Sequence, residues 1–185
     1  MDFDLPPAND PRRLAVKQWL AGHPQPTATQ LVDAGYVVPH WPEPWGLNAD
    51  PLHQIIIDDE LAKAGVSRPA NQIGIGWAGP TLLTAGTEEQ KQRYLRPLLT
   101  GREIWCQMFS EPDAGSDLAN VATRAVRDGD EYVVNGSKIW TSAGHLSQFG
   151  ILIARTNPEV PKHEGISYFI CPTDLPGLTM TPIVD

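Results

Sequence analysis

The sequence predicts an α+β protein in which helices come first and an antiparallel sheet or barrel follows. Apolar residues recur at helical spacing up to Gly101, whereas from Ile104 onward they form short runs separated by turn signals. A block of helices followed by a block of strands is typical of α+β architecture. We therefore expect a helical domain over residues 1–103 and a β domain over residues 104–185.

The composition limits the classes of function. The chain has 185 residues, of which 41% are hydrophobic and 19% charged, as in ordinary globular proteins. Its 14 Lys and Arg residues against 22 Asp and Glu residues give a net charge of −8, which argues against nucleic-acid binding. Cys106 and Cys171 match neither a metal-ligand spacing nor a disulfide framework, so we expect no metal and a reducing, cytoplasmic location. We expect no signal peptide and no membrane span.

Capping residues and prolines mark the helices of the first half. Asp50 and Pro51 open the most regular helix, since Asp is a favoured cap and Pro suits the first turn. Thr87 caps another helix and is followed by two glutamates at the positive end of the helix dipole. Helices are expected over residues 11–22, 27–34, 50–64, 80–85 and 87–99.

Two features of the first half are interpreted as structural. The glycines at 74, 76 and 79 match a dinucleotide-binding pattern in letters only, because no strand precedes them and Pro80 follows at once. Close packing of helices is the better explanation of these glycines. The aromatic segment over residues 36–46 contains Trp41 and Trp45, which we expect to be structural.

The second half reads as short strands joined by turns. Asp128-Gly129 and Asn135-Gly136 are strong hairpin signals. After a first strand at Trp105, strands are expected over residues 121–126, 131–134, 137–142, 149–154, 166–171 and 178–183.

Two stretches of the second half carry the functional signal. Residues 106–117 read Cys-Gln-Met-Phe-Ser-Glu-Pro-Asp-Ala-Gly-Ser-Asp, and Pro112 should end the strand before a polar turn around Gly115. Alone, this stretch is most simply a capped turn. The second stretch, residues 135–144, favours a functional interpretation of both stretches together. It reads Asn-Gly-Ser-Lys-Ile-Trp-Thr-Ser-Ala-Gly.

In this order and spacing, the two stretches resemble the acyl-CoA dehydrogenase family. The family pattern is a hydrophobic residue and Thr/Ser-Glu-Pro-x-Ala-Gly-Ser-Asp, then a hairpin and Asn-Gly-x-Lys-x-Trp-x-Thr/Ser. The resemblance covers nearly the whole chain. It implies a helical N-terminal domain over residues 1–103 and an antiparallel β-barrel middle domain over residues 104–185. We expect the barrel to be incomplete and the family's C-terminal helical bundle to be absent.

The resemblance also implies a cofactor, FAD, and an acyl-CoA substrate. Ser110 corresponds to a hydroxyl residue near the flavin pyrimidine, Ser142 to one near N5, and Trp140 to an aromatic residue along the isoalloxazine. Ser116 corresponds to a residue shared between FAD and substrate. The implied cofactor-binding residues are Gln107, Met108, Phe109, Ser110, Ser116, Trp140, Thr141 and Ser142. Gln107 and Asp113 depart from residues common in the family, which bears on substrate specificity.

The implied reaction removes a proton from Cα of the thioester while a hydride passes from Cβ to flavin N5. The family's base is a glutamate of the C-terminal bundle, so no catalytic residue is assigned here, and Glu111 is interpreted as structural. The implied partners are an electron-transfer flavoprotein and further subunits of a homodimer, tetramer or hetero-oligomer. Two alternatives remain: an oxidase or monooxygenase on the same scaffold, and a non-catalytic subunit. Motif variants resemble actinobacterial members, some of which process steroid side chains.

Overall fold

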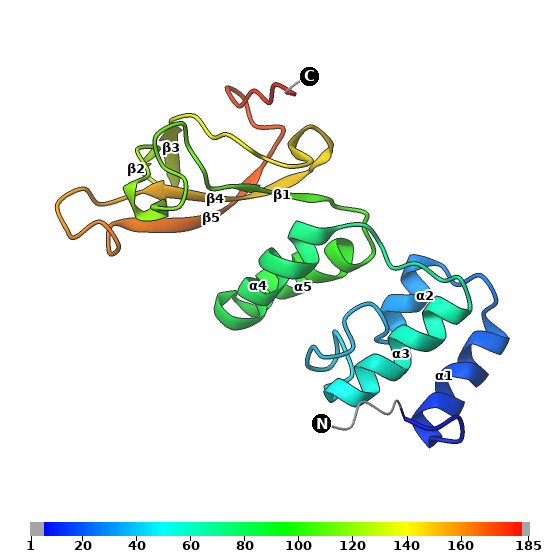
Figure 1. Cartoon of the computed structure of the whole chain (residues 1–185). Coiled ribbons are helices and arrows are strands. Elements are labelled where there is room, and N and C mark those ends of the chain that lie inside the picture. Colours follow the sequence, from blue (N-terminus) through cyan, green and yellow to red (C-terminus); the bar gives the residue numbers. More distant parts are fainter. Residues whose placement is uncertain (1–5, 183–185) are drawn as a thin grey trace. The chain divides into compact units, whose positions relative to one another are not determined.

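The computed structural model describes residues 6–182 (Figure 1). These residues form two compact units, one of residues 6–71 and 81–102 and the other of residues 72–80 and 103–182. Helices precede strands along the chain, which confirms the α+β prediction. The second unit also takes in residues 72–80, which lie before the expected boundary at 103.

Side-chain caps define the helices. Asp50 accepts a hydrogen bond from the N–H of His53 at 2.8 Å, and Thr27 and Thr87 each form a capping box with the glutamine three residues later. These caps satisfy N–H groups that lack a partner within the helix. The α-helices are α1 (Pro11–Gly22), α2 (Ala28–Asp33), α3 (Pro51–Lys63), α4 (Gly79–Ala85) and α5 (Glu88–Leu99). The five expected helices are therefore confirmed, with ends shifted by a residue at most.

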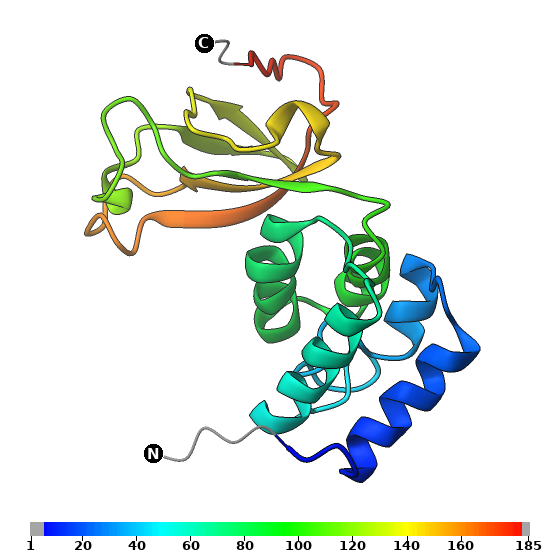
Figure 2. The ribbon, with the colours of Figure 1, turned by 45° about the vertical axis from the view of Figure 1, so that its right-hand side comes forward.

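The core of the first unit lies between its helices. Val16 of α1 and Ile56 of α3 are almost fully buried where α1 packs against α3, and Figure 2 shows these two helices side by side. Arg13 of α1 is buried as well and pairs with Asp59 and Glu60 of α3. The aromatic segment that follows α2 folds around Trp41, which is 4% exposed and therefore structural, as predicted.

A π-helix, η1 (Gly74–Ala78), runs directly into α4. Because no strand precedes it, the structure confirms that the glycine pattern is not a dinucleotide fingerprint. Gly74 is buried, in keeping with close packing, but a Cβ at Gly76 would meet open space. Trp77 is 52% exposed, and its ring meets that of Phe109 edge to face at 6.4 Å.

The second unit contains one five-stranded sheet, whose strand order is β1-β4-β2-β3 with β5 also paired to β4. β4 is antiparallel to β5, and β2 to β3, but β1 runs parallel to β4. β2 also pairs with β4 in parallel, at Arg124 and Arg155. The sheet is therefore mixed, and the expectation of antiparallel pairing was wrong where β1 and β2 meet β4. The strands are β1 (Trp105–Met108), β2 (Arg124–Asp128), β3 (Glu131–Asn135), β4 (Phe149–Arg155) and β5 (Ile166–Pro172).

Two expected strands do not form among the described residues. Residues 137–142 are irregular, and Trp140 and Ala143 have left-handed backbone with φ of 58° and 59°. Such residues interrupt an extended run, which needs negative φ. Residues 178–182 are also irregular, and position 183 of that prediction lies outside the described residues.

One row of the sheet is rich in sulfur. Cys106 of β1 and Cys171 of β5 are both in register with Gly150 of β4, and both thiols are free and buried. A Cβ at Gly150 would lie 2.2 Å from Met108 Cε and 3.1 Å from Cys106 Sγ. The missing side chain of Gly150 therefore leaves the space that Met108 and Cys106 fill.

Candidate functional site

The loop that follows β1 closes on itself. The N–H of Glu111 donates to the carbonyl of Ala114 at 2.8 Å, and the N–H of Ala114 donates back at 3.2 Å. Pro112 lies inside this turn, where its missing N–H costs no sheet hydrogen bond. The turn brings the Glu111 side chain inward, where only 6% of the residue is exposed.

The Glu111 carboxylate is fully engaged. It accepts hydrogen bonds from the main-chain N–H groups of Ala122 at 2.6 Å and Thr123 at 3.0 Å, and from Lys138 Nζ at 2.7 Å. Burial raises the pKa of Glu111, but hydrogen bonds from Lys138 and from these main-chain groups outweigh burial and lower the pKa to about 2. Glu111 is therefore ionised near neutral pH, and its oxygens are occupied by structural donors.

Lys138 joins the two motif stretches. Its Nζ also donates to the carbonyl oxygen of Phe109 at 3.0 Å, and the N–H of the next residue, Ile139, donates to the carbonyl of Ser110 at 2.9 Å. The Lys138 side chain is 9% exposed. Burial lowers the pKa of Lys138, while the hydrogen bond and charge of Glu111 oppose this effect. The end of β1 and the loop after β3 are thus fastened together.

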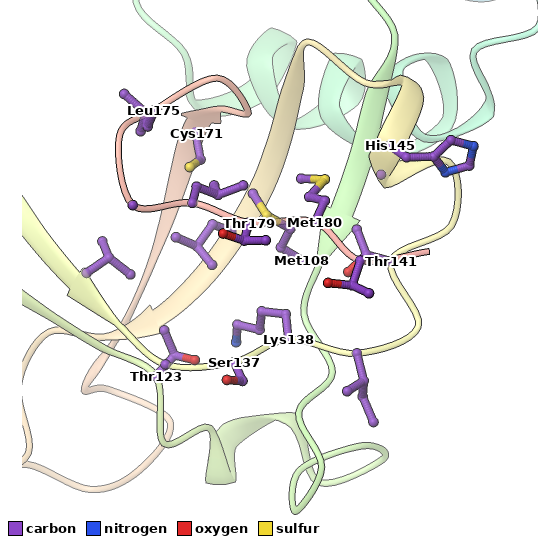
Figure 3. A pocket seen from close by; sticks show the side chains of 18 of the residues that line it. Met108, Thr123, Ser137, Lys138, Thr141, His145, Cys171, Leu175, Thr179 and Met180 are labelled. Carbon is purple, nitrogen blue, oxygen red and sulfur yellow. The ribbon is translucent and has the colours of Figure 1, made fainter. Parts of the chain in front are cut away.

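A cleft of about 920 Å³ opens beside this junction within the second unit (Figure 3). β3, the loop after it and the chain that follows β5 form its walls. Met108, Leu152 and Cys171 give it an apolar, buried floor. Met180 packs against the cluster that contains Met108, and Figure 3 shows Lys138 and Ser137 elsewhere in the same cleft. Its lining, part apolar and part polar, suits a ligand that has both an apolar body and polar groups.

The predicted site residues divide between the cleft and its surroundings. Met108, Trp140, Thr141 and Ser142 line the cleft. The Trp140 residue is 72% exposed, which is unusual for the largest aromatic side chain.

The other four predicted residues, Gln107, Phe109, Ser110 and Ser116, are not among those that line the cleft. Ser110 is nevertheless held next to the cleft by its hydrogen bond with Ile139. Ser116 lies in the exposed turn beside Asp117, whose carboxylate pairs with Lys162 at 2.7 Å.

Sequence reasoning missed the role of Lys138 in assembling the site. Lys138 belongs to the second motif stretch, but no structural or functional role was assigned to it from the sequence. The sequence alone gives no signal for this role, because neither the burial of Lys138 nor its partner Glu111, 27 positions away, follows from a local pattern. Among the described residues, no group of three or more His, Cys, Asp or Glu side chains could hold a metal ion. Within residues 6–182, no helix has the length and apolar character needed to cross a bilayer.

Known proteins match both halves of the chain. The family description "Acyl-CoA dehydrogenase, N-terminal domain" matches residues 11–102, and "Acyl-CoA dehydrogenase, middle domain" matches residues 106–185. A curated relative, acyl-CoA dehydrogenase FadE34 of Mycobacterium tuberculosis, is 48% identical over 153 residues, covering 83% of this chain and 21% of the relative.

Two solved structures are similar along almost the full length of the chain. The structure titled "Tcur3481-Tcur3483 steroid ACAD" is 36% identical with a TM-score of 0.76, and the match covers 99% of this chain and 52% of that one. The ChsE4-ChsE5 complex from Mycobacterium tuberculosis is 35% identical with a TM-score of 0.77, covering 100% of this chain and 51% of that one. The chain thus spans about half the length of these solved chains. Because both family descriptions match in order and together cover nearly all of it, the chain belongs to the acyl-CoA dehydrogenase family.

Proposed function

We propose that this chain supplies the flavin and thioester contacts of an FAD-dependent enzyme that oxidises the Cα–Cβ bond of an acyl-CoA. The observation that supports this most is the junction between the two motif stretches. Lys138 reaches the Phe109 carbonyl, and Ile139 bonds to Ser110. These bonds keep Ser110 close to the segment from Trp140 to Ser142, which supports a ligand that contacts both.

The residues present fit a flavin. An isoalloxazine is a flat aromatic group with hydrogen-bonding edges, and the exposed indole of Trp140 at the cleft offers a surface on which it can stack. The hydroxyls of Thr141 and Ser142 lie in the same segment and can donate to its polar edge. Bound FAD would supply the hydride acceptor for oxidation of the thioester.

Each predicted residue has a proposed task. Trp140 would cover one face of the ring system, and Ser110 and Ser142 would donate hydrogen bonds where negative charge develops. Ser116 would contact both the cofactor and the acyl-CoA. Gln107, Met108, Phe109 and Thr141 would provide main-chain contacts and walls.

Glu111 is not proposed as the base that removes the Cα proton. A base needs a free lone pair near the substrate and a pKa near the working pH. Glu111 has three hydrogen-bond donors on its carboxylate and a pKa of about 2. We therefore do not assign the base to Glu111; the family resemblance supports a glutamate of the C-terminal helical bundle in this role.

The substrate and partner proposals rest on the two similar solved structures. One similar structure is described as a steroid dehydrogenase, which supports a bulky polycyclic acyl group rather than a straight chain. Both similar structures carry the names of two proteins, which supports a partner subunit of a different sequence over a homo-oligomer. Comparing kcat/KM for a steroid side-chain thioester with that for a straight-chain thioester tests the substrate proposal.

Electron-transfer flavoprotein is the proposed electron acceptor, and rapid oxygen consumption during turnover would instead indicate an oxidase.

The central test measures flavin binding in the intact protein. Trp140→Ala should weaken FAD binding about tenfold because it removes a stacking surface, and Ser142→Ala should weaken it about three- to tenfold because it removes one hydrogen bond. Ser67→Ala, which changes an exposed hydroxyl in the first unit, is the matched control and should bind normally. Failure of the unaltered protein to bind FAD would refute the proposed function. Normal binding by both cleft variants would refute the residue assignments alone.

A further inference from the structure

The ion pair between Lys138 and Glu111 connects three separate segments at one point. Lys138 Nζ lies 2.7 Å from Glu111 Oε1 and 3.0 Å from the Phe109 carbonyl oxygen. The same carboxylate holds the main chain at Ala122 and Thr123. The pair thus joins the end of β1, the residues just before β2 and the loop after β3.

Stability alone does not explain a buried pair of this kind. Both side chains are buried, with 9% exposed for Lys138 and 6% for Glu111. Withdrawing two charges from water is costly, and a well-packed apolar pair of similar volume is often as stable. What an apolar pair cannot provide is a donor with a fixed direction toward the Phe109 carbonyl and the Glu111 carboxylate.

The backbone beyond Lys138 shows what the pair holds in place. Residues 137–142 have the β-branched and aromatic composition of a strand, yet Trp140 and Ala143 adopt left-handed φ. Non-glycine residues persist in this conformation only where their surroundings impose it. The bonds made by Lys138 and Ile139 immediately precede Trp140 and fasten this segment to residues 109–111.

We propose that Lys138 and Glu111 are positioning residues, which hold Trp140 and Ser142 at a fixed spacing from Ser110 and so set the affinity for the flavin. This inference rests on the proposed function. Beyond that function, it gives the buried ion pair an indirect role: the pair affects flavin binding without contacting the flavin. Without the pair, residues 139–143 relax toward the extended conformation that their sequence favours, and the two halves of the site lose their spacing.

The experiment compares FAD affinity with thermal stability in the intact protein. Lys138→Met should weaken FAD binding about tenfold or more and also lower Tm, because it leaves the Glu111 carboxylate buried without its partner. The double variant Glu111→Gln, Lys138→Met removes both charges and should recover Tm, but not FAD affinity. Lys138→Arg keeps a charged donor and should retain more of the affinity than Lys138→Met.

Glu60→Gln is the matched control. Glu60 is a buried carboxylate that pairs with Arg13 in the first unit, so its loss should lower Tm and leave FAD affinity unchanged. FAD affinity that follows Tm through all variants, Glu60→Gln included, would overturn the positioning role. Normal FAD binding by the folded double variant would also overturn it and leave the proposed function intact. Absence of FAD binding by the unaltered protein would overturn both.

Discussion

The Glu111 carboxylate is bonded to the main chain before β2 and to the side chain of Lys138, so its protonation would release two loops at once. Its pKa in the folded protein is about 2, against an ordinary value of 4.5. A pKa that folding lowers contributes stability above the ordinary pKa, and this contribution disappears as the pH falls toward the folded value. Glu111 should therefore matter most for resistance to acid.

We expect Glu111→Gln to make the free energy of unfolding less dependent on pH between about pH 5 and pH 2, because the titrating group is gone. Urea denaturation at a series of pH values measures this dependence. Parallel curves for the two proteins would show that other carboxylates cause the acid sensitivity.

Single residues were predictable where the chemistry is local. The caps Asp50 and Thr87 follow from neighbouring residues, and the structure confirms them. The contact between Lys138 and Glu111 joins residues 27 positions apart. No local pattern encodes such a separation, so the pair could be found only in the folded chain.

At the scale of elements, the capping box of α5 is a local determinant of stability. Thr87 accepts from the N–H of Gln90, and the Gln90 side chain accepts from the N–H of Thr87. We expect Thr87→Ala to lower the free energy of unfolding by about 1 kcal/mol, because an N–H at the start of the helix loses its acceptor. Thr87→Ser keeps the hydroxyl and should restore most of this loss in chemical denaturation. An equal loss in both variants would assign the effect to the threonine methyl group.

The hairpin between β4 and β5 depends on Gly165. The Gly165 carbonyl accepts from the N–H groups of Thr156 and Asn157, and a Cβ at this position would lie 2.0 Å from the Asn157 carbonyl oxygen. Gly165→Ala should therefore destabilise the protein by about 1–3 kcal/mol or more, because the backbone must move.

Gly76→Ala is the control for this substitution, since a Cβ at Gly76 meets nothing within 4 Å. Thermal denaturation of both variants provides the comparison. Equal melting temperatures would mean that the hairpin relaxes around the added methyl group without cost.

Helices and most strands were predictable from hydrophobic periodicity and turn residues. The irregular structure of residues 137–142, where a strand was expected, was not. These residues favour extended structure, whereas Trp140 has left-handed φ and the neighbouring Lys138 is bonded to residues 109 and 111, which are distant in the sequence. The parallel pairing of β1 with β4 was equally hidden, because Trp105 and Phe149, which lie in register, are far apart in the sequence and no pattern within either strand encodes their pairing.

On the scale of the molecule, each compact unit has its own buried core. Ile56 of α3 is 0% exposed in the first unit, and Ile151 of β4 is 1% exposed in the second. Truncating either side chain to alanine should cost about 2–5 kcal/mol. Hydrogen exchange should accelerate mainly in α1 and α3 for Ile56→Ala, and mainly in β4 and β5 for Ile151→Ala. Uniform acceleration across both units would show that they open as one.

The row through Gly150 has a consequence for redox chemistry. Adjacent strands lie about 4.8 Å apart, so the Cα atoms of Cys106 and Cys171 are separated by roughly 9.6 Å, beyond the ~7 Å limit for a disulfide. Neither thiol can reach the other while β4 lies between them. An oxidant therefore cannot form a disulfide between them in the native sheet. A Cys106–Cys171 disulfide would show that β4 had separated from β1 and β5.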